Sequence, residues 1–233
     1  MVIRNELNHL AVIMDGNSRW AQQNMLDRYL GHKTGAEKAK LLIELAYNNK
    51  IKHLSLFAFS SENWQRSSPE IDYLLNLLAS YLDTQSQKLL DKGIKLLVIG
   101  DLNNLSNELK NKIIAINDSS PKEIHMNLYI AFSYGGREEL VQAVKKALSM
   151  KMLADEVSEA NFANLLYAPQ MPNIDLLIRT GGNNRISNFL LWHSAYSEIY
   201  FIKKYWPDFS EEDLMMAIDQ YKMSNRTFGA RNE

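Results

Sequence analysis

The chain has no cysteine among its 233 residues, which excludes a disulfide framework and any thiolate metal site. No apolar run is long enough to span a bilayer, and the opening segment MVIRNELNHL lacks the apolar core of a signal peptide. An excess of either charge is also missing, because 26 basic and 27 acidic residues leave a formal net charge of -1. Overall attraction to nucleic acid is therefore excluded, and anion binding has to come from individually placed arginines. We expect a cytoplasmic protein.

Little in the sequence marks a linker or a domain boundary. The chain has only five prolines and ten glycines, and it contains no internal repeat and no low-complexity tract. Hydrophobic residues make up 46% of the chain, which is ample for a buried core. A single domain over residues 1–233 is the simplest prediction.

Short apolar runs alternate with longer amphipathic segments along the chain. We expect strands at residues 10–14, 53–59, 94–99, 126–132, 174–178 and 199–202. We expect helices near residues 33–49, 70–92, 103–117, 137–149, 158–166 and 210–224. This alternation predicts an α/β fold with a central, mostly parallel six-stranded sheet that helices cover on both faces.

Polar segments that contain an arginine follow several of the expected strands. They read DGNSRW at 15–20, SSENWQR at 60–66, SYGGR at 133–137 and RTGG at 179–182. In open α/β sheets ligands bind beyond the carboxyl ends of the strands, and arginine forks with close backbone amides suit phosphate oxygens. Taken singly, each has an ordinary explanation, since Asp15 is equally suited to cap a helix and a Gly-Gly pair is usually just a turn. Their recurrence at several strand ends favours a site for more than one phosphate group.

Five segments of the sequence together resemble the cis-prenyltransferase family. They are HLAVIMDGNSRWA, GHKTGAEKA, LFAFSSENWQR, YGGR and DLLIRTGGNNRISNFLLWHSAYSEIYF, in order between about residues 9 and 229. Within the family, the chain is most similar to the undecaprenyl diphosphate synthases of bacteria.

The resemblance implies an enzyme that condenses isopentenyl diphosphate onto farnesyl diphosphate with Mg²⁺ as cofactor and forms cis double bonds. The undecaprenyl diphosphate so made is a lipid carrier precursor for peptidoglycan synthesis. A homodimer is implied as well, with no nucleic-acid partner and at most transient contact with a membrane surface.

The resemblance also implies roles for individual residues. The allylic diphosphate would bind the first loop and three further side chains: Gly16, Asn17, Ser18, Arg19, Trp20, Arg28, His32 and Arg66. The isopentenyl diphosphate would bind Arg179, Thr180, Arg185, Ile186 and Ser187. The block after the second strand adds the substrate-binding residues Ser60, Ser61, Glu62 and Trp64. Asn63 matches a residue associated with proton removal, and because an amide is a poor base we expect it to orient the substrate or relay the proton to diphosphate.

Two carboxylates match metal-associated positions of the family. Asp15 would hold Mg²⁺, a hard cation that suits carboxylate and phosphate oxygens, and Glu198 would be the second carboxylate. The growing hydrocarbon must leave water, so an apolar tunnel should run between the sheet and the helices. Its candidate wall residues are Leu41, Leu42, Leu74, Leu77 and Leu78, each of which suits ordinary core packing equally well.

The chain departs from the family's pattern at three places. Ser18 stands where the family has glycine, Asn183 and Asn184 stand where it has an acid and often a histidine, and Thr227 stands in its carboxyl-terminal Arg-x-Gly. A positive φ at residue 18 would strain a serine, whereas an ordinary φ would not.

Three alternatives to an undecaprenyl diphosphate synthase stay open. The first is a cis-prenyltransferase whose product has a different length. The second is a non-catalytic partner subunit, and the presence of the expected site residues argues against it: Asp15, Asn63, Arg179 and Arg185. A nucleotide-binding α/β protein would explain the first loop, yet the sequence has neither a Walker lysine pattern nor a GxGxxG fingerprint.

Overall fold

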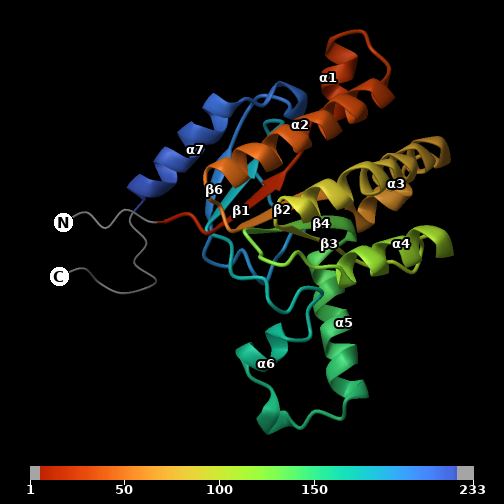
Figure 1. The fold of residues 1–233 in the computed structure, drawn as a ribbon, viewed down its shortest axis with the longest axis vertical. Helices are drawn as coiled ribbons and strands as arrows, with labels where there is room; N and C mark the ends of the chain where they lie inside the picture. The colour runs from red at the N-terminus through yellow and green to blue at the C-terminus, as the bar shows by residue number, and fades with distance from the viewer. Residues whose placement is uncertain (1–5, 225–233) are drawn as a thin grey trace.

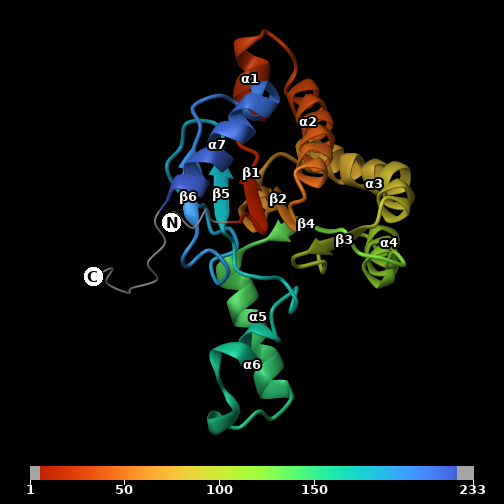
Figure 2. The ribbon, with the colours of Figure 1, turned by 60° about the vertical axis from the view of Figure 1, so that its left-hand side comes forward.

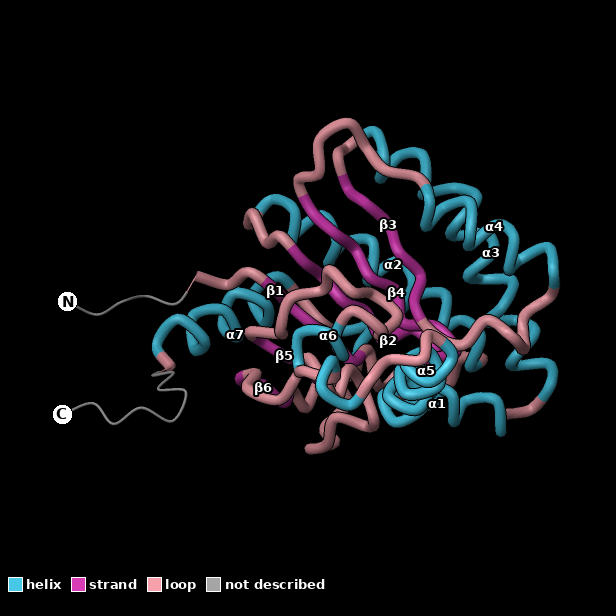
Figure 3. The backbone as a smooth tube through the Cα atoms, turned by 90° about the horizontal axis from the view of Figure 1, so that it is seen from below, coloured by secondary structure: helices cyan, strands magenta, loops and turns pink. Residues whose placement is uncertain are grey.

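A six-stranded parallel sheet forms the centre of the computed structural model, which describes residues 6–224. The strands are β1 (His9–Ile13), β2 (His53–Ser60), β3 (Ile94–Ile99), β4 (Met126–Tyr134), β5 (Leu176–Arg179) and β6 (Glu198–Phe201). They lie in the order β3-β4-β2-β1-β5-β6 (Figure 3), and every neighbouring pair is parallel. The expected α/β architecture with six strands is confirmed, and the sheet is wholly rather than mostly parallel.

Seven α-helices and three short 3-10 helices connect the strands in the described part of the chain. The α-helices are α1 (Asn17–Gln23), α2 (Arg28–Asn48), α3 (Ser68–Asp91), α4 (Asn107–Asp118), α5 (Gly136–Ser149), α6 (Glu159–Ala163) and α7 (Glu211–Met223). The 3-10 helices are η1 (Ser61–Gln65), η2 (Ala154–Glu156) and η3 (Trp206–Asp208).

Side-chain caps explain where two of the helices begin. Asp27 accepts a hydrogen bond from the Tyr29 amide at 2.8 Å, so α2 begins at Arg28, five residues before the expected start. Ser106 accepts one from the Leu109 amide at 3.3 Å, so α4 begins at Asn107 rather than near 103. The segment expected to be helical at 158–166 is only one short helix, Glu159–Ala163.

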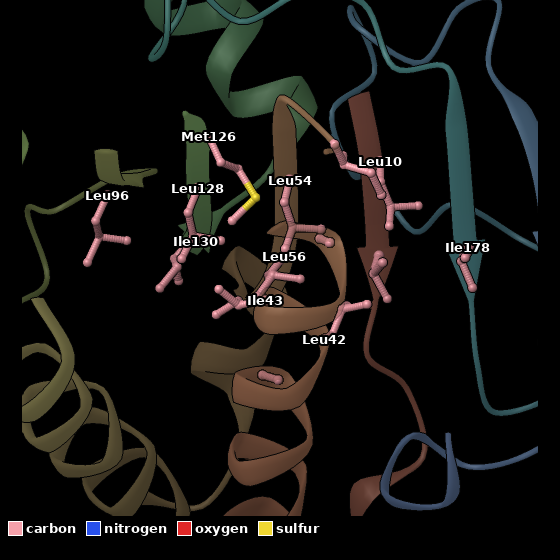
Figure 4. Packing of buried hydrophobic residues seen from close by; sticks show 14 of the residues in the cluster. Leu10, Leu42, Ile43, Leu54, Leu56, Leu96, Met126, Leu128, Ile130 and Ile178 are labelled. Carbon is pink, nitrogen blue, oxygen red and sulfur yellow. The ribbon is translucent and has the colours of Figure 1, made fainter. Parts of the chain in front are cut away.

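The main core lies between one face of the sheet and helices α2, α3, α4 and α7. Leu10, Leu54, Leu56, Leu128 and Ile130 point from the strands toward Leu42 and Ile43 of α2 (Figure 4). Alternate residues of the same strands face the other side, where Ala11, Ile13, Tyr129 and Ala131 pack against loop residues such as Phe189 and Leu190. Because successive side chains of a strand point to opposite faces of the sheet, each of these strands contributes to two apolar layers.

Helices α5 and α6 form an arm that projects away from the sheet (Figures 1 and 2). A small separate core of Ala143, Leu165 and Leu166 holds this arm together. Among residues 6–224, no helix combines the length and the apolar character needed to cross a membrane.

Because all six strands run in one direction, their carboxyl ends meet at one edge of the sheet. Asp15 and α1 follow β1 there, η1 follows β2, and the loop that begins at Thr180 follows β5. The SYGGR segment follows β4 there as well, so the fold brings all four arginine-containing segments of the sequence to the same edge.

Candidate active site

A polar cavity of about 790 Å³ opens at the carboxyl edge of the sheet. Eleven of the residues expected to bind ligands line it: Asp15, Asn17, Arg19, His32, Ser60, Glu62, Asn63, Arg66, Arg179, Arg185 and Ser187. They come from the ends of β1, β2 and β5 and from α1, α2, η1 and the loop after β5, so the fold brings together segments that lie far apart in the sequence.

Asp15 lies at the centre of a network of charged groups. Its carboxylate accepts hydrogen bonds from Arg179 Nη2 and Asn183 Nδ2, both at 2.9 Å, and pairs with Arg19 Nη2 at 3.0 Å. Burial alone would raise the pKa of Asp15, but the hydrogen bonds from Asn183 and Arg179 and the charge of Arg19 lower it below its usual value. Asp15 is thus an anion that partly faces the cavity.

The backbone of Asp15 is fixed as firmly as its side chain. The Thr180 hydroxyl donates to the Asp15 carbonyl at 2.8 Å and accepts from the Asp15 amide at 3.1 Å. Gly16 then turns the chain into α1 with a φ of 114°, and a Cβ there would lie only 2.7 Å from the Tyr205 ring. Both the conformation and the space require glycine at this position.

A second charged cluster surrounds Glu70, which the sequence did not single out. The residue is 7% exposed, and its carboxylate accepts from Arg66 Nη1 at 2.8 Å and Arg28 Nη1 at 3.2 Å, while His32 Nε2 lies 3.3 Å away. Burial and the charge of Arg66 lower the pKa of His32, against the opposing effect of Glu70. Three expected allylic-site residues are therefore gathered by one carboxylate. The spacing of four between Arg66, just before α3, and Glu70 was a local sequence signal for only one of these contacts.

Arg179 organises the loop that follows β5. The residue is 4% exposed, and its Nη1 donates to the Arg185 carbonyl and to Ser187 Oγ, the latter at 2.7 Å. Arg185 Nη1 in turn donates to Asn183 Oδ1 at 3.3 Å. Of the expected isopentenyl-site residues, Arg179 thus contacts Arg185 and Ser187, whereas Thr180 contacts Asp15 and Ile186 packs into the apolar layer behind the loop.

The η1 turn places Asn63 at the cavity wall. Asn63 Oδ1 accepts from the Ser60 amide at 3.0 Å, which fixes the side chain and leaves its amide nitrogen as a donor. Glu62 Oε1 accepts from Asn188 Nδ2 at 3.2 Å, and Trp64 Nε1 donates to Ser133 Oγ at 2.9 Å.

An apolar cavity of about 120 Å³ continues from the polar one between the sheet and helices α2 and α3. Met14, Asn17, His32, Phe57, Ala58 and Leu74 line both. Of the leucines expected in a tunnel wall, Leu74, Leu77 and Leu78 line the apolar cavity. Leu41 is exposed and Leu42 lies in the core, so the expectation is wrong for these two. They lie on sides of α2 that turn away from the cavity.

The remaining expected residues lie beside the polar cavity rather than in its wall. Trp20 donates from its indole nitrogen to Asp208 Oδ1 at 2.7 Å, and Arg28 reaches the cluster only through Glu70. Ser61, Trp64, Gly16 and Ser18 are likewise absent from the lining, although Ser18 Oγ lies 3.5 Å from His32 Nε2.

Glu198 lies at the other end of the sheet from Asp15. Glu198 begins β6 and pairs with Leu176 of the neighbouring strand β5. Arg179, three residues further along β5, pairs with Ile13 of β1. At the rise of a β-strand, three residues correspond to roughly 10 Å, so Glu198 lies about that far along the strand direction from the end of β1. The structure therefore does not bring the two carboxylates together within one chain.

The departures from the family pattern have different structural outcomes. Ser18 lies in the first turn of α1 without a positive φ, so serine is unstrained there. Asn183 contacts Asp15 directly, and Asn184 is exposed. Thr227 lies outside the described residues.

Fold and site together define an α/β protein that can hold anionic groups beside an apolar chain. The family model described as "Putative undecaprenyl diphosphate synthase" matches residues 13–229. The isoprenyl transferase of Rickettsia conorii is 47% identical over 98% of this chain and 97% of its own. That of Aquifex pyrophilus is 45% identical over 95% of each chain.

Two solved structures extend this likeness to the fold. Lavandulyl diphosphate synthase from Lavandula x intermedia, in complex with dimethylallyl diphosphate, is 35% identical with a TM-score of 0.90, covering 96% of this chain and 98% of that one. A probable undecaprenyl diphosphate synthase from Campylobacter jejuni is 34% identical with a TM-score of 0.80, covering 97% and 99%. The chain belongs to the cis-prenyltransferase family, whose members are also named isoprenyl transferases.

Proposed function

We propose that this protein is an undecaprenyl diphosphate synthase. It would condense isopentenyl diphosphate units onto farnesyl diphosphate, in a Mg²⁺-dependent reaction, to make the lipid carrier precursor of peptidoglycan. The observation that carries the proposal is the direct continuation of an arginine-lined polar cavity into an apolar one. An allylic diphosphate has this same division, with a charged head and a hydrocarbon tail.

Asp15 fits the role of the Mg²⁺ ligand. Its carboxylate is 26% exposed and ionised, and it lies in the cavity wall. Mg²⁺ is commonly held by one or two carboxylates together with substrate phosphates and water, so the site does not need an acidic cluster. Among residues 6–224 there is no group of three acidic or histidine side chains arranged for a metal. Mg²⁺ at Asp15 would neutralise negative charge on the departing diphosphate.

The chain's own residues would bind the allylic diphosphate and stabilise its departure. Backbone amides in the first turn of a helix have no partner within that helix, so those of α1 are available to phosphate oxygens. Arg19 and Arg66 line the same cavity, where their charges oppose the negative charge that builds up as the C1–O bond breaks.

The loop after β5 would hold the second substrate. Arg185 and Ser187 reach the cavity beside Arg179, which suits a diphosphate that needs several donors. The double bond of the isopentenyl unit then attacks the allylic C1, and one proton leaves the isopentenyl unit as the new double bond forms. The free amide nitrogen of Asn63 would orient the diphosphate groups during this step.

A product of shorter length is the alternative that a specific observation favours. The apolar cavity holds about 120 Å³, a small space for a long hydrocarbon. A homodimer is also part of the proposal, because α5 exposes Val141, Val144 and Leu148 along one stripe at helical spacing. The cytoplasmic location expected from the sequence stays a prediction.

Product analysis tests the proposal. Purified protein is incubated with farnesyl diphosphate, labelled isopentenyl diphosphate and Mg²⁺, and the extracted products are sized by chromatography. We expect label in products of eleven isoprene units. Absence of incorporation would contradict prenyl transfer altogether, and a main product of few units would contradict only the undecaprenyl assignment.

A further inference from the structure

We propose that Asn188 is a positioning residue that fixes the isopentenyl diphosphate loop and the η1 turn relative to one another. The inference rests on the proposed function, because it concerns the second substrate of that reaction. Asn188 lies in the wall of the polar cavity, next to Ser187. Neither the composition of the sequence nor its strand-end arginines singled it out.

The backbone around Asn188 has an unusual conformation. Ser187, Asn188 and Leu190 have φ values of 47°, 62° and 42°. Such left-handed residues cost energy unless the surroundings hold them, and asparagine tolerates this region better than most side chains. Because Ser187 precedes Asn188 directly and accepts from Arg179, whatever holds Asn188 also holds this Ser187–Arg179 contact.

Three hydrogen bonds hold Asn188, and they come from two different elements. Its carbonyl accepts from the Gly136 amide at 2.7 Å, and its Oδ1 accepts from the Arg137 amide at 2.9 Å. Its Nδ2 donates to Glu62 Oε1 at 3.2 Å. Asn188 thus caps the amino terminus of α5 with its oxygens while it contacts η1 with its nitrogen.

The SYGGR segment has a different role from the one its arginine suggested. A Cβ at Gly135 would lie 2.5 Å from Ser61 Oγ and 3.0 Å from Asn188 Nδ2, and one at Gly136 would lie 2.7 Å from Leu191 Cγ and 2.9 Å from the Asn188 carbonyl oxygen. Gly135 is the N-cap residue of α5 and has no side chain that could accept a hydrogen bond from the helix. Asn188 supplies this cap from another segment. Gly135, Gly136 and Arg137 are all absent from the cavity lining. The two glycines make room for Asn188 together with Ser61 and Leu191.

The contact with Glu62 links the two halves of the candidate site. Glu62 immediately precedes Asn63, whose side chain is fixed within η1. Asn188 immediately follows Ser187, which belongs to the isopentenyl diphosphate loop. The Asn188–Glu62 hydrogen bond therefore sets the separation between the diphosphate of one substrate and the residue expected to orient the reaction.

A swap of donor and acceptor tests this link. Asn188→Gly keeps a left-handed backbone but removes both side-chain contacts, and we expect KM for isopentenyl diphosphate to rise about tenfold, as the loss of one or two hydrogen bonds predicts. KM for farnesyl diphosphate should change less than twofold.

Asn188→Asp places a carboxylate against Glu62 and should raise KM for isopentenyl diphosphate further. Asn188→Asp combined with Glu62→Gln restores a hydrogen bond of reversed direction. That double variant should return to within about threefold of wild type.

Asn184→Gly is the matched control, since Asn184 is an exposed asparagine in the same loop and does not line the cavity. Thermal unfolding of every variant separates positioning from general destabilisation, which would affect both substrates equally. A wild-type KM in Asn188→Gly, or a double variant no better than Asn188→Asp, would overturn the inference. Calorimetric binding of isopentenyl diphosphate to the wild-type protein is measured alongside. If the wild type neither binds it nor turns over, it is the proposed function that fails.

Discussion

Asp15 holds the charged groups of the candidate site together, and this gives it a structural as well as a chemical role. We expect Asp15→Ala to lower turnover by at least about 100-fold through loss of the metal carboxylate. Because buried Arg179 then loses its ionic partner, unfolding free energy should also fall by about 1–3 kcal/mol. Steady-state kinetics and urea unfolding measure the two effects. Near-normal turnover in a folded variant would refute the assigned role.

Asn183 stands beside Asp15 where the family has an acid, so an acid there tests what the departure does. In Asn183→Asp two carboxylates would face each other at the distance of the present 2.9 Å hydrogen bond. We expect a lower Tm without Mg²⁺ and at least several-fold tighter Mg²⁺ binding, with Tm rising as Mg²⁺ is added. Asn184→Asp adds the same charge at an exposed neighbour and is the control. Identical Mg²⁺ titrations of the wild type and both variants would show that asparagine at position 183 does not weaken Mg²⁺ binding.

The sequence indicated residues with a strong local signal and missed those whose role depends on distant contacts. Asp15 and Arg179 lie at the ends of strands and could be found from strand-end patterns, whereas Ser187 was indicated by the family resemblance. Glu70 and Asn188 act through partners from other segments, at separations of 38 residues for His32 and 126 residues for Glu62. A single sequence does not encode those separations in any local pattern.

At the scale of the elements, strands were predicted to within about two residues at each end, because buried parallel strands are continuous apolar runs bounded by polar residues. Helix starts were less accurate. Asn17 to Trp20 were expected as a loop, yet they form the first turn of α1, because Gly16 completes the turn and the helix begins directly after it.

Tyr81 of α3 offers a test of product length. Together with Ile43 it lines both the apolar cavity of about 120 Å³ and a separate polar cleft of about 460 Å³. Tyr81→Ala would join the two spaces, and we expect longer products with KM values unchanged within about twofold. Leu75→Ala, on the same helix but outside both linings, is the control. Product chromatography decides, and an unchanged distribution in Tyr81→Ala would show that this wall does not limit chain length.

His9 ties β1 to β2 at the opposite edge of the sheet. Its Nδ1 donates to the Pro172 carbonyl at 2.8 Å, and its Nε2 lies 2.8 Å from Ser55 Oγ, from which it accepts when the ring is neutral. Burial lowers the pKa of His9 to about 3 and that of His193 to about 4. The unfolded chain binds these protons below pH ~6.5 while the fold does not.

Stability should therefore fall as the pH falls from about 6.5 toward 4, by about 1.4 kcal/mol per pH unit for each histidine. Urea unfolding between pH 7.5 and 4.5 measures this slope. His9→Gln keeps one donor and one acceptor but cannot take up a proton, so its slope should be smaller by the contribution of one histidine. Equal slopes in the two proteins would show that His9 is not buried in its neutral form.

At the scale of the whole molecule, the sheet separates two tasks. One edge collects the charged residues, one face with α2 and α3 encloses the apolar cavity, and the arm of α5 and α6 reaches away from both (Figure 1). The arm is joined to the site through the Asn188 cap at the start of α5. A partner that binds the arm would therefore act next to the loop after β5, where we propose that isopentenyl diphosphate binds.

We expect the exposed stripe on α5 to be the surface that binds a second copy of this chain in the proposed homodimer. Val141, Val144 and Leu148 are 52%, 48% and 71% exposed, and residues spaced by three and four lie on one face of a helix. Such a stripe suits a symmetric interface, in which the same surface of both copies is buried.

We expect light scattering to give twice the mass of one chain at micromolar concentration. Val144→Glu should give the mass of one chain with unchanged far-ultraviolet circular dichroism, since Val144 is not part of the small core that holds the arm together. Lys145→Glu places the same carboxylate on the next exposed position of the helix and should stay dimeric. A monomeric wild type, or a dimeric Val144→Glu, would exclude this surface as the interface.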